Sequence, residues 1–458
     1  MKTNNPGASG VRYVYFITAV AALGGLLFGY DTAVIAGAIG SIETKFQLTP
    51  ALTGWAASSA IWGCVFGAMF AGFLSDRLGR KKVLLVTAVL FAISAIGSAL
   101  PNNLTQFVLA RFIGGVGVGA ASMLSPMYIS ELAPADKRGM LVTLYQLAIV
   151  LGINLIYFVN LKIAGMGSEA WNLETGWRLM LGSEAIPALL FLIALFFVPE
   201  SPRWLAGKNR DQEALGILVR INGPAKAAAV LDEVKSTLRQ EKGTIKELFA
   251  PGLRTAMLVG MFLALFSQIT GINAIIYYAP EIFKNVGFGT DSALFQTLII
   301  GIINTIFTFV AIKFIDQVGR RKLLLWGVSG MAICLIGVGI VFHFELNSGP
   351  LLLFFILGFI ASFASSLGPI PWVIISEIFP TKTRGIAMSF ATFTLWIGVV
   401  LITQFTPVLL DRFGGAPTFW IFAINAVILL LFTYFKIPET KGKTLEEIEH
   451  YWKGNDHA

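Results

Sequence analysis

Two ionisable side chains interrupt segments of this chain that are otherwise apolar. Asp31 lies in the sequence GGLLFGYDTAV, and Arg111 lies in FVLARFIGGVGVG. A lone charge at the centre of a lipid bilayer costs at least about 2.5–3.5 kcal/mol, so such a residue is a candidate functional group. If both segments are helices that rise about 1.5 Å per residue, Asp31 and Arg111 lie at similar depth, roughly 10–12 Å from the outer ends of their segments.

A carboxylate and a guanidinium at one depth can neutralise each other, which keeps the carboxylate ionised while the pair lasts. If a conformational change moves Arg111 away, the buried Asp31 takes up a proton. This pattern predicts that protonation is coupled to a conformational change. The alternative is a permanent ion pair that only fixes helix register, which we consider weaker because buried ion pairs are poor stabilisers.

A second set of polar side chains within the apolar segments is neutral. Amides offer both hydrogen-bond donors and acceptors, and aromatic faces stack on the C–H face of a pyranose ring, so the set suits a polyhydroxyl ligand. For each residue taken singly, the competing interpretation is a hydrogen bond between membrane helices. The set consists of Gln146, Gln268, Asn273, Asn304, Tyr277, Trp372 and Trp396.

A third set is charged and lies at the ends of the apolar segments. Acids there are not needed for membrane topology, so we predict that they pair with arginines of neighbouring hairpins and latch the two halves of the molecule. The alternative is solvated loop charge. This predicted cytoplasmic gating network comprises Asp76, Arg80, Glu131, Arg138, Glu200 and Arg203 in the first half, and Asp316, Arg320, Glu377 and Arg384 in the second.

The composition indicates that membrane-spanning helices position these residues. Of 458 residues, 56% are hydrophobic and only 13% are charged, whereas a soluble domain carries about 25% charged residues. A membrane helix needs about 20 apolar residues, and twelve such segments are present. We place them at 13–39, 51–74, 82–100, 105–126, 140–163, 178–198, 254–280, 291–315, 322–343, 350–376, 384–408 and 416–436.

Most of the 34 Lys and Arg residues lie in alternate connections between these segments. The positive-inside rule then places both termini in the cytoplasm. The net charge of +8 is explained by this topology, so no nucleic-acid partner is expected.

The chain also repeats itself at about half its length. SDRLGRKK at 75–82 recurs as IDQVGRRK at 315–322, and Glu131 with Arg138 recurs as Glu377 with Arg384. Two six-helix halves that rock around a central site are typical of transporters. We predict an all-α membrane protein with a first half at 1–198, a cytoplasmic helical linker at 199–253, a second half at 254–436 and a cytoplasmic tail at 437–458.

These residues lie in motifs that resemble the sugar porter family of the major facilitator superfamily. The motifs are GGLLFGYDTAVIAG (24–37), DRLGRKK (76–82), PESPRW (199–204), QITGINAIIYYAP (268–280), DQVGRRK (316–322) and PETKGKTLEEIE (438–449). The first and fourth segments most resemble those of the family's bacterial proton-coupled xylose symporters.

The resemblance implies that Asp31 is the proton acceptor and Arg111 its partner. It also implies that the neutral set, joined by Phe28, contacts the sugar. Ser267 and Leu395 replace amide side chains that are frequent in the family, so the resemblance leaves the identity of the sugar open.

The predicted function is proton-coupled import of a monosaccharide, a pentose or hexose of the D-xylose or D-glucose type, by alternating access. We expect a monomer in the bacterial inner membrane, without cofactor or metal. An uncoupled sugar uniporter is the main alternative; a nutrient sensor and a drug efflux carrier fit less well. An enzyme is not expected, because no nucleophile with a base, metal cluster or phosphate loop is visible.

Overall fold

The computed structural model describes most of the chain. The described residues are 8–134, 137–239, 245–250, 253–346, 349–379, 383–442, 447–448 and 451–452. For residues 8–9, 237, 239, 245, 316, 376 and 384, only the backbone is described.

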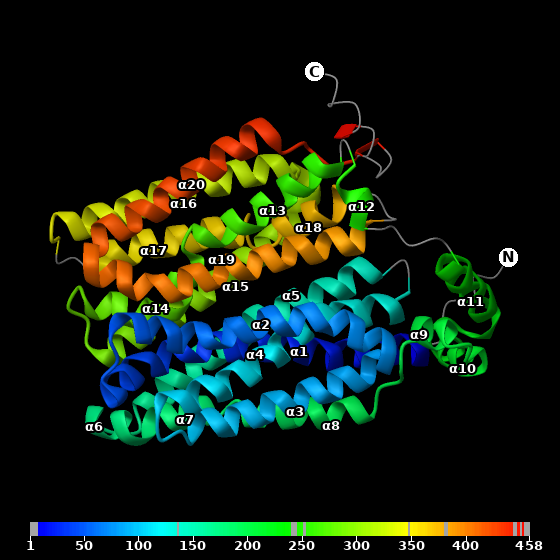
Figure 1. Cartoon of the computed structure of the whole chain (residues 1–458), viewed down its shortest axis with the longest axis horizontal. Coiled ribbons are helices and arrows are strands. Elements are labelled where there is room, and N and C mark those ends of the chain that lie inside the picture. The colour runs from blue at the N-terminus through cyan, green and yellow to red at the C-terminus, as the bar shows by residue number, and fades with distance from the viewer. Residues whose placement is uncertain are drawn as a thin grey trace. The chain divides into compact units, whose positions relative to one another are not determined.

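The regular elements of the described chain are helices (Figure 1). Up to the central insert they are α1 (Ala8–Phe46), α2 (Pro50–Leu78), α3 (Arg80–Ala99), α4 (Leu104–Leu132), α5 (Arg138–Ala164), α6 (Glu169–Trp171), η1 (Asn172–Gly176), α7 (Trp177–Gly182) and α8 (Ala185–Phe196). The insert carries α9 (Pro202–Gly207), α10 (Asp211–Asn222), α11 (Pro224–Arg239) and α12 (Ile245–Leu248). Beyond it follow α13 (Leu253–Ile269), α14 (Ile272–Lys284), α15 (Thr290–Val318), α16 (Arg320–His343), α17 (Gly349–Ala364), α18 (Ile370–Glu377), α19 (Arg384–Phe413) and α20 (Gly415–Lys436).

The helices account for the predicted apolar segments. Eleven helical segments of the described chain are long and apolar enough to cross a membrane, and α17 is a shorter apolar helix. A helix satisfies its backbone hydrogen bonds internally, which is why it can cross hydrocarbon. The twelve apolar segments expected from the sequence therefore each have a helical counterpart.

Three predicted segments are divided in the structure. The segment 178–198 is α7 followed by α8, with Ser183 and Glu184 between them. The segment 254–280 is α13 followed by α14, separated at Gly271, which has a left-handed φ of 95°. The segment 350–376 is α17 followed by α18, with Gly368 and Pro369 between them. A hydropathy pattern averages over such breaks, because a single residue in an unusual backbone conformation leaves the mean unchanged.

The described chain packs into two compact units. Unit 1 comprises Met1–Thr32, Trp62–Ile153 and Leu181–Glu241. In it α3 packs against α4 and α8, and α9, α10 and α11 pack together around a small apolar core of the insert (Figure 1).

Unit 2 comprises Ala33–Ile61, Asn154–Met180 and Lys242–Ala458. In it α16 packs against α20 and α17, and α13 and α14 both pack against α19. The unit also contains the second part of α1, the first part of α2 and the second part of α5. The units follow the packing of this structure, whereas the predicted halves follow the sequence repeat, and those halves remain a prediction.

Candidate functional site

Asp31 and Arg111 form a buried ion pair in unit 1. Arg111 Nη1 lies 2.5 Å from Asp31 Oδ1, and Nη2 donates a hydrogen bond of 2.9 Å to the Asp31 backbone carbonyl. Asp31 is 0% exposed and Arg111 is 1% exposed. The pairing predicted from their similar depth is therefore present, with a guanidinium that holds both the carboxylate and the backbone of α1.

Glycines allow the helices around this pair to approach closely. A Cβ on Gly114 of α4 would lie 2.2 Å from Ser94 Oγ of α3, and a Cβ on Gly29 of α1 would lie 1.9 Å from the Ile149 carbonyl of α5. Larger residues at either position would push the helices apart. The glycine-rich sequences around Asp31 and Arg111 thus bring two charged residues from different helices into contact.

A second buried carboxyl completes the cluster. Glu184, between α7 and α8, is 1% exposed and interacts electrostatically with both Asp31 and Arg111. Asp31 Oδ2 and Glu184 Oε1 are buried and accept no hydrogen bond from the part of the chain that the structure describes. The cluster therefore holds two acids and one base, with a free acceptor oxygen on each acid.

The sequence prediction did not include Glu184, although a signal for it was present. Glu184 is an ionisable residue within the predicted apolar segment 178–198, as Asp31 is within 13–39. The criterion that singled out Asp31 and Arg111 would have found Glu184 had it been applied to the sixth segment.

The predicted sugar-binding amides of the seventh segment lie together in unit 2. Asn273 Nδ2 donates a hydrogen bond of 2.8 Å to Gln268 Oε1, and Gln268 Nε2 lies 3.1 Å from Ser267 Oγ. The break between α13 and α14 brings Gln268 and Asn273 together across Gly271. Gly398 of α19, whose Cβ would lie 3.0 Å from Gln268 Cβ, lets α19 approach this group.

The remaining predicted sugar contacts differ in burial. In unit 2, Asn304 is 8% exposed, Tyr277 and Trp396 are 3% exposed, and Trp372 is 38% exposed. In unit 1, Phe28 and Gln146 are half-buried. Their role in binding sugar stays a prediction.

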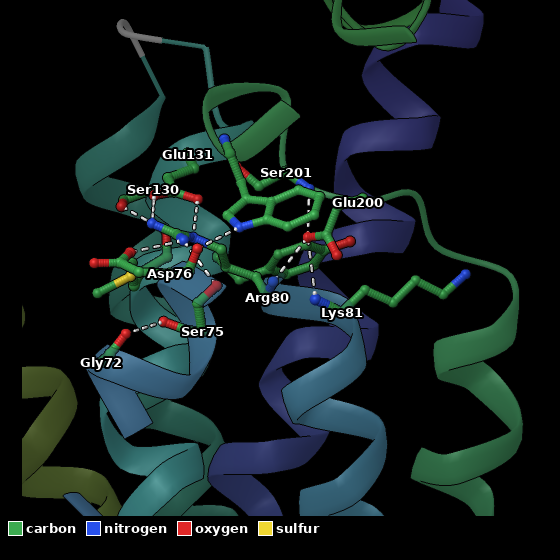
Figure 2. Close-up of polar contacts among 12 residues, drawn as sticks. Gly72, Ser75, Asp76, Arg80, Lys81, Ser130, Glu131, Glu200 and Ser201 are labelled. Carbon is green, nitrogen blue, oxygen red and sulfur yellow. Dashed lines mark hydrogen bonds and ion pairs between the residues drawn. The ribbon is translucent and has the colours of Figure 1, made fainter. Parts of the chain in front are cut away.

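Arg80 organises a cluster of charges at one end of unit 1 (Figure 2). Its guanidinium donates two hydrogen bonds to Glu131, of 3.0 and 3.1 Å, and one of 3.0 Å to Asp76 Oδ1. It also donates to the Ser75 carbonyl at 3.1 Å. The side chains of Arg80 and Glu131 are 9% and 7% exposed, so this is a buried, bidentate ion pair. The Trp204 indole donates to the Asp76 carbonyl at 3.0 Å.

Glu200 caps the start of α3 beside this cluster. Its Oε1 accepts hydrogen bonds from the backbone N–H groups of Arg80 and Lys81, at 2.9 and 3.1 Å. These N–H groups have no partner within the helix. Gly79 precedes them with a φ of 103°, and a Cβ there would lie 2.3 Å from Glu200 Oε2. The turn therefore requires glycine for both its conformation and its space.

The corresponding cluster of unit 2 is built on Arg320. Arg320 Nη2 donates a hydrogen bond of 3.1 Å to Glu377 Oε1, and Thr440 Oγ1 donates one of 2.5 Å to Glu377 Oε2. Glu439 accepts from the backbone N–H groups of Arg320 and Arg321, at 2.9 and 3.2 Å, after Gly319 with a φ of 98°. The sequence repeat is thus reproduced as the same helix cap.

Two members of the predicted gating network do not join these clusters. Arg138 and Arg203 are exposed and form no ion pair with the described side chains. The side chains of Asp316 and Arg384 lie outside the described ones. The acids and arginines that do pair lie within one unit in each case, so the latch between the halves remains a prediction.

The chain matches known proteins over nearly its whole length. The profile of the sugar (and other) transporter family matches residues 17–452. The chain is 48% identical to the arabinose-proton symporter of Bacillus subtilis over 441 residues, which covers 96% of this chain and 95% of that protein. It is 42% identical to the D-xylose-proton symporter of Escherichia coli K12 over 473 residues, which covers 96% of each chain.

Solved structures agree with this. The inward-open conformation of the xylose transporter XylE from E. coli is 41% identical, with a TM-score of 0.87 over 96% of this chain and 100% of that one. The structure of XylE, a major facilitator superfamily proton:xylose symporter, with 6-bromo-6-deoxy-D-glucose bound has a TM-score of 0.80, at 41% identity over 97% and 100% of the two chains. The chain is therefore a multi-pass membrane transporter, not an enzyme, and belongs to the sugar (and other) transporter family.

Proposed function

We propose that this protein imports a monosaccharide together with a proton, and that the cluster of Asp31, Arg111 and Glu184 carries the proton. The relatives described as proton symporters of arabinose and xylose support a pentose, and the neutral polar residues allow a hexose of the D-glucose type. The buried cluster is the single observation on which the proton coupling rests.

The charge balance of the cluster favours one bound proton. With all three side chains ionised, two carboxylates and one guanidinium leave one uncompensated negative charge. Each acid is at most 1% exposed, and an unpaired charge is costly in such surroundings. One proton on either acid makes the cluster neutral, and a free acceptor oxygen is available on both.

In this proposal the sugar is recognised by the amide side chains of Gln268 and Asn273 in unit 2. Gln268 and Asn273 are held together at the break between α13 and α14, where each can exchange its internal hydrogen bond for one to a hydroxyl. Asn304, Tyr277, Trp372 and Trp396 of the same unit are the further proposed contacts. Ser267 offers only a hydroxyl, which donates to the Ala264 carbonyl at 2.7 Å.

We further propose that the ends with the Arg80 and Arg320 clusters face the cytoplasm of a bacterial inner membrane, that both termini lie there, and that the monomer is the functional form. The distribution of Lys and Arg supports this orientation. We call the other ends of the helices the outer ends.

Contacts within unit 2 support a state closed on the outer side. Ser58 of α2 donates to Gln404 Oε1 of α19 at 2.6 Å, and Gln404 Nε2 donates to the Ala51 carbonyl at 3.1 Å. Asn154 of α5 donates to the Gly301 carbonyl of α15 at 2.9 Å. These bonds join helices from the two predicted halves, in the outer half of each helix.

The decisive variants remove one acid at a time. In Asp31→Asn, Arg111 and Glu184 balance each other without a proton, and in Glu184→Gln, Arg111 and Asp31 do. Either variant should lose accumulation of labelled sugar against a gradient, and alkalinisation of the medium on sugar addition, while keeping sugar exchange. Proteoliposomes with an imposed pH gradient, with and without a protonophore, measure all three.

Asp291→Asn is the matched control, because Asp291 is exposed at the start of α15. It should accumulate sugar as the parent does. Concentrative uptake that survives in Asp31→Asn would contradict the coupling assignment, and parent protein that moves sugar without proton flux would identify a uniporter. Competition by unlabelled D-xylose, L-arabinose and D-glucose then ranks the substrates.

A further inference from the structure

A proline in α14 leaves one backbone carbonyl without its helical partner. Pro280 lies inside the helix, and proline has no N–H to donate to the residue four positions earlier. That residue is Ile276. Its carbonyl therefore needs a donor from outside the helix or from water.

Tyr157 of α5 supplies this donor. Its hydroxyl donates a hydrogen bond of 2.8 Å to the Ile276 carbonyl, and the tyrosine is 2% exposed. Gly301 of α15 makes room for the tyrosine, since a Cβ there would lie 3.0 Å from its ring. The bond joins helices that belong to different predicted halves, seven residues before the outer end of α5 and eight residues before the outer end of α14.

A second proline and tyrosine pair provides an internal comparison. Pro407 lies inside α19, so the Thr403 carbonyl lacks its helical donor. The Tyr278 hydroxyl of α14 donates to that carbonyl at 2.8 Å. Here both helices belong to the same predicted half, so the bond need not break when the halves move.

We propose that Tyr157 and Pro280 form a latch for the outer side: proline frees the Ile276 carbonyl, and the Tyr157 hydroxyl binds it only while the outer ends are closed. The inference rests on the alternating access proposed above. When α5 moves away from α14, the Tyr157 hydroxyl and the Ile276 carbonyl both form hydrogen bonds with water. The latch therefore stabilises the closed state by the net free energy of one buried hydrogen bond. Tyr157 is thus a positioning residue that sets the ratio of open to closed protein without contacting sugar or proton.

The test measures that ratio directly in full-length protein in lipid nanodiscs. Spin labels are attached at Gln47→Cys, beyond α1, and Asn285→Cys, beyond α14, with Cys334 replaced by alanine; Cys64 is 0% exposed and stays. Double electron–electron resonance then gives the populations of short and long distances. Tyr157→Phe should raise the ratio of long to short distances about 3- to 10-fold, the range expected from one hydrogen bond.

Two further variants separate the latch from a general loss of structure. Tyr278→Phe removes the same group from the comparable bond within one half, and should leave the distance ratio within about 2-fold of the parent. In a Pro280→Ala background, the new N–H binds the Ile276 carbonyl, so Tyr157→Phe should shift the ratio less than half as far on a logarithmic scale.

Either of two results overturns the proposal: an unchanged ratio in Tyr157→Phe, or an equal shift with and without Pro280. If Tyr157→Phe does not fold, Pro280→Ala alone should raise the ratio by about 2-fold, and an unchanged ratio there is equally negative. The distance readout needs no transport, so a failure of proton coupling in Asp31→Asn leaves the result interpretable.

Discussion

The Arg80 cluster of unit 1 and the Arg320 cluster of unit 2 share a sequence motif but not the same burial. Arg80 donates to two acids and a carbonyl at 3.0 to 3.1 Å, and its partner Glu131 is 7% exposed. Arg320 donates to Glu377 at 3.1 Å and to the Ile315 carbonyl at 3.4 Å, and the side chains of Arg320 and Glu377 are 13% and 25% exposed. The repeat thus preserves the backbone cap in both units, whereas the guanidinium is enclosed more fully in the first.

This difference shows that the repeated motif preserves the geometry of the helix cap more reliably than the strength of the ion pair beside it. Both caps depend on backbone N–H groups and a glycine, which the local sequence supplies. The strength of each ion pair depends on what covers it. In unit 1 the Trp204 indole binds the Asp76 carbonyl, whereas the second PETKGK motif has Lys443 at the corresponding position.

The largest expected effect is a difference in stability between variants of Arg80 and Arg320. Arg80→Ala leaves the buried Glu131 carboxylate without its bidentate partner, which should cost about 3–5 kcal/mol of unfolding free energy. Arg320→Ala should cost only about 1–2 kcal/mol, because Glu377 is partly exposed and keeps the Thr440 hydrogen bond. Thermal unfolding of the purified variants in one detergent compares them, and equal losses would remove the distinction.

The next effect should be equal in the two clusters. Gly79→Ala and Gly319→Ala each place a Cβ at a φ near 100° and within 2.3 or 2.6 Å of the capping carboxylate. We expect each to lose about 2–3 kcal/mol of stability, from backbone strain together with displacement of the acid.

Gly223→Ala is the matched control, because it measures the cost of backbone strain alone. Gly223 has a φ of 81° with no atom within 4 Å of an added Cβ, so its loss should be about 1–2 kcal/mol. If Gly79→Ala and Gly319→Ala lose no more stability than Gly223→Ala, the added Cβ atoms do not displace the capping carboxylates.

The smallest effect concerns the cover of the first cluster. Trp204→Phe keeps an aromatic ring but loses the indole donor to the Asp76 carbonyl, and should cost about 0.5–1.5 kcal/mol. The same thermal unfolding measures it. If combined with Arg80→Ala, the two losses should not add, because both act on one cluster. Strict additivity would show that Trp204 contributes nothing to the Arg80 cluster.

Much of the fold was accessible from the sequence. The apolar segments, the repeat and the charged interruptions Asp31 and Arg111 are local patterns, and each has its counterpart in the structure. The helix breaks within the predicted segments 178–198, 254–280 and 350–376 do not show in the hydropathy pattern, because a mean over about 20 residues is unchanged by one short turn.

The candidate site was accessible to a lesser extent. The sequence named Asp31, Arg111, Gln268 and Asn273, and it placed Arg138 and Arg203 in a network that their described side chains do not join. It missed Glu184. Charge and polarity can be read along the chain, but a partner on another helix depends on how far each helix is rotated and shifted along its axis.

The sequence by itself therefore determined the membrane fold, the family and the two charges that the bilayer would not otherwise tolerate, because hydropathy and motif spacing are properties of the chain. Only the tertiary structure decided that Glu184 joins Asp31, that Glu200 and Glu439 cap α3 and α16, and that Tyr157 reaches the carbonyl freed by Pro280. The physical reason is that these contacts join segments far apart in sequence. Close packing at small residues sets their distances, and no local pattern records them.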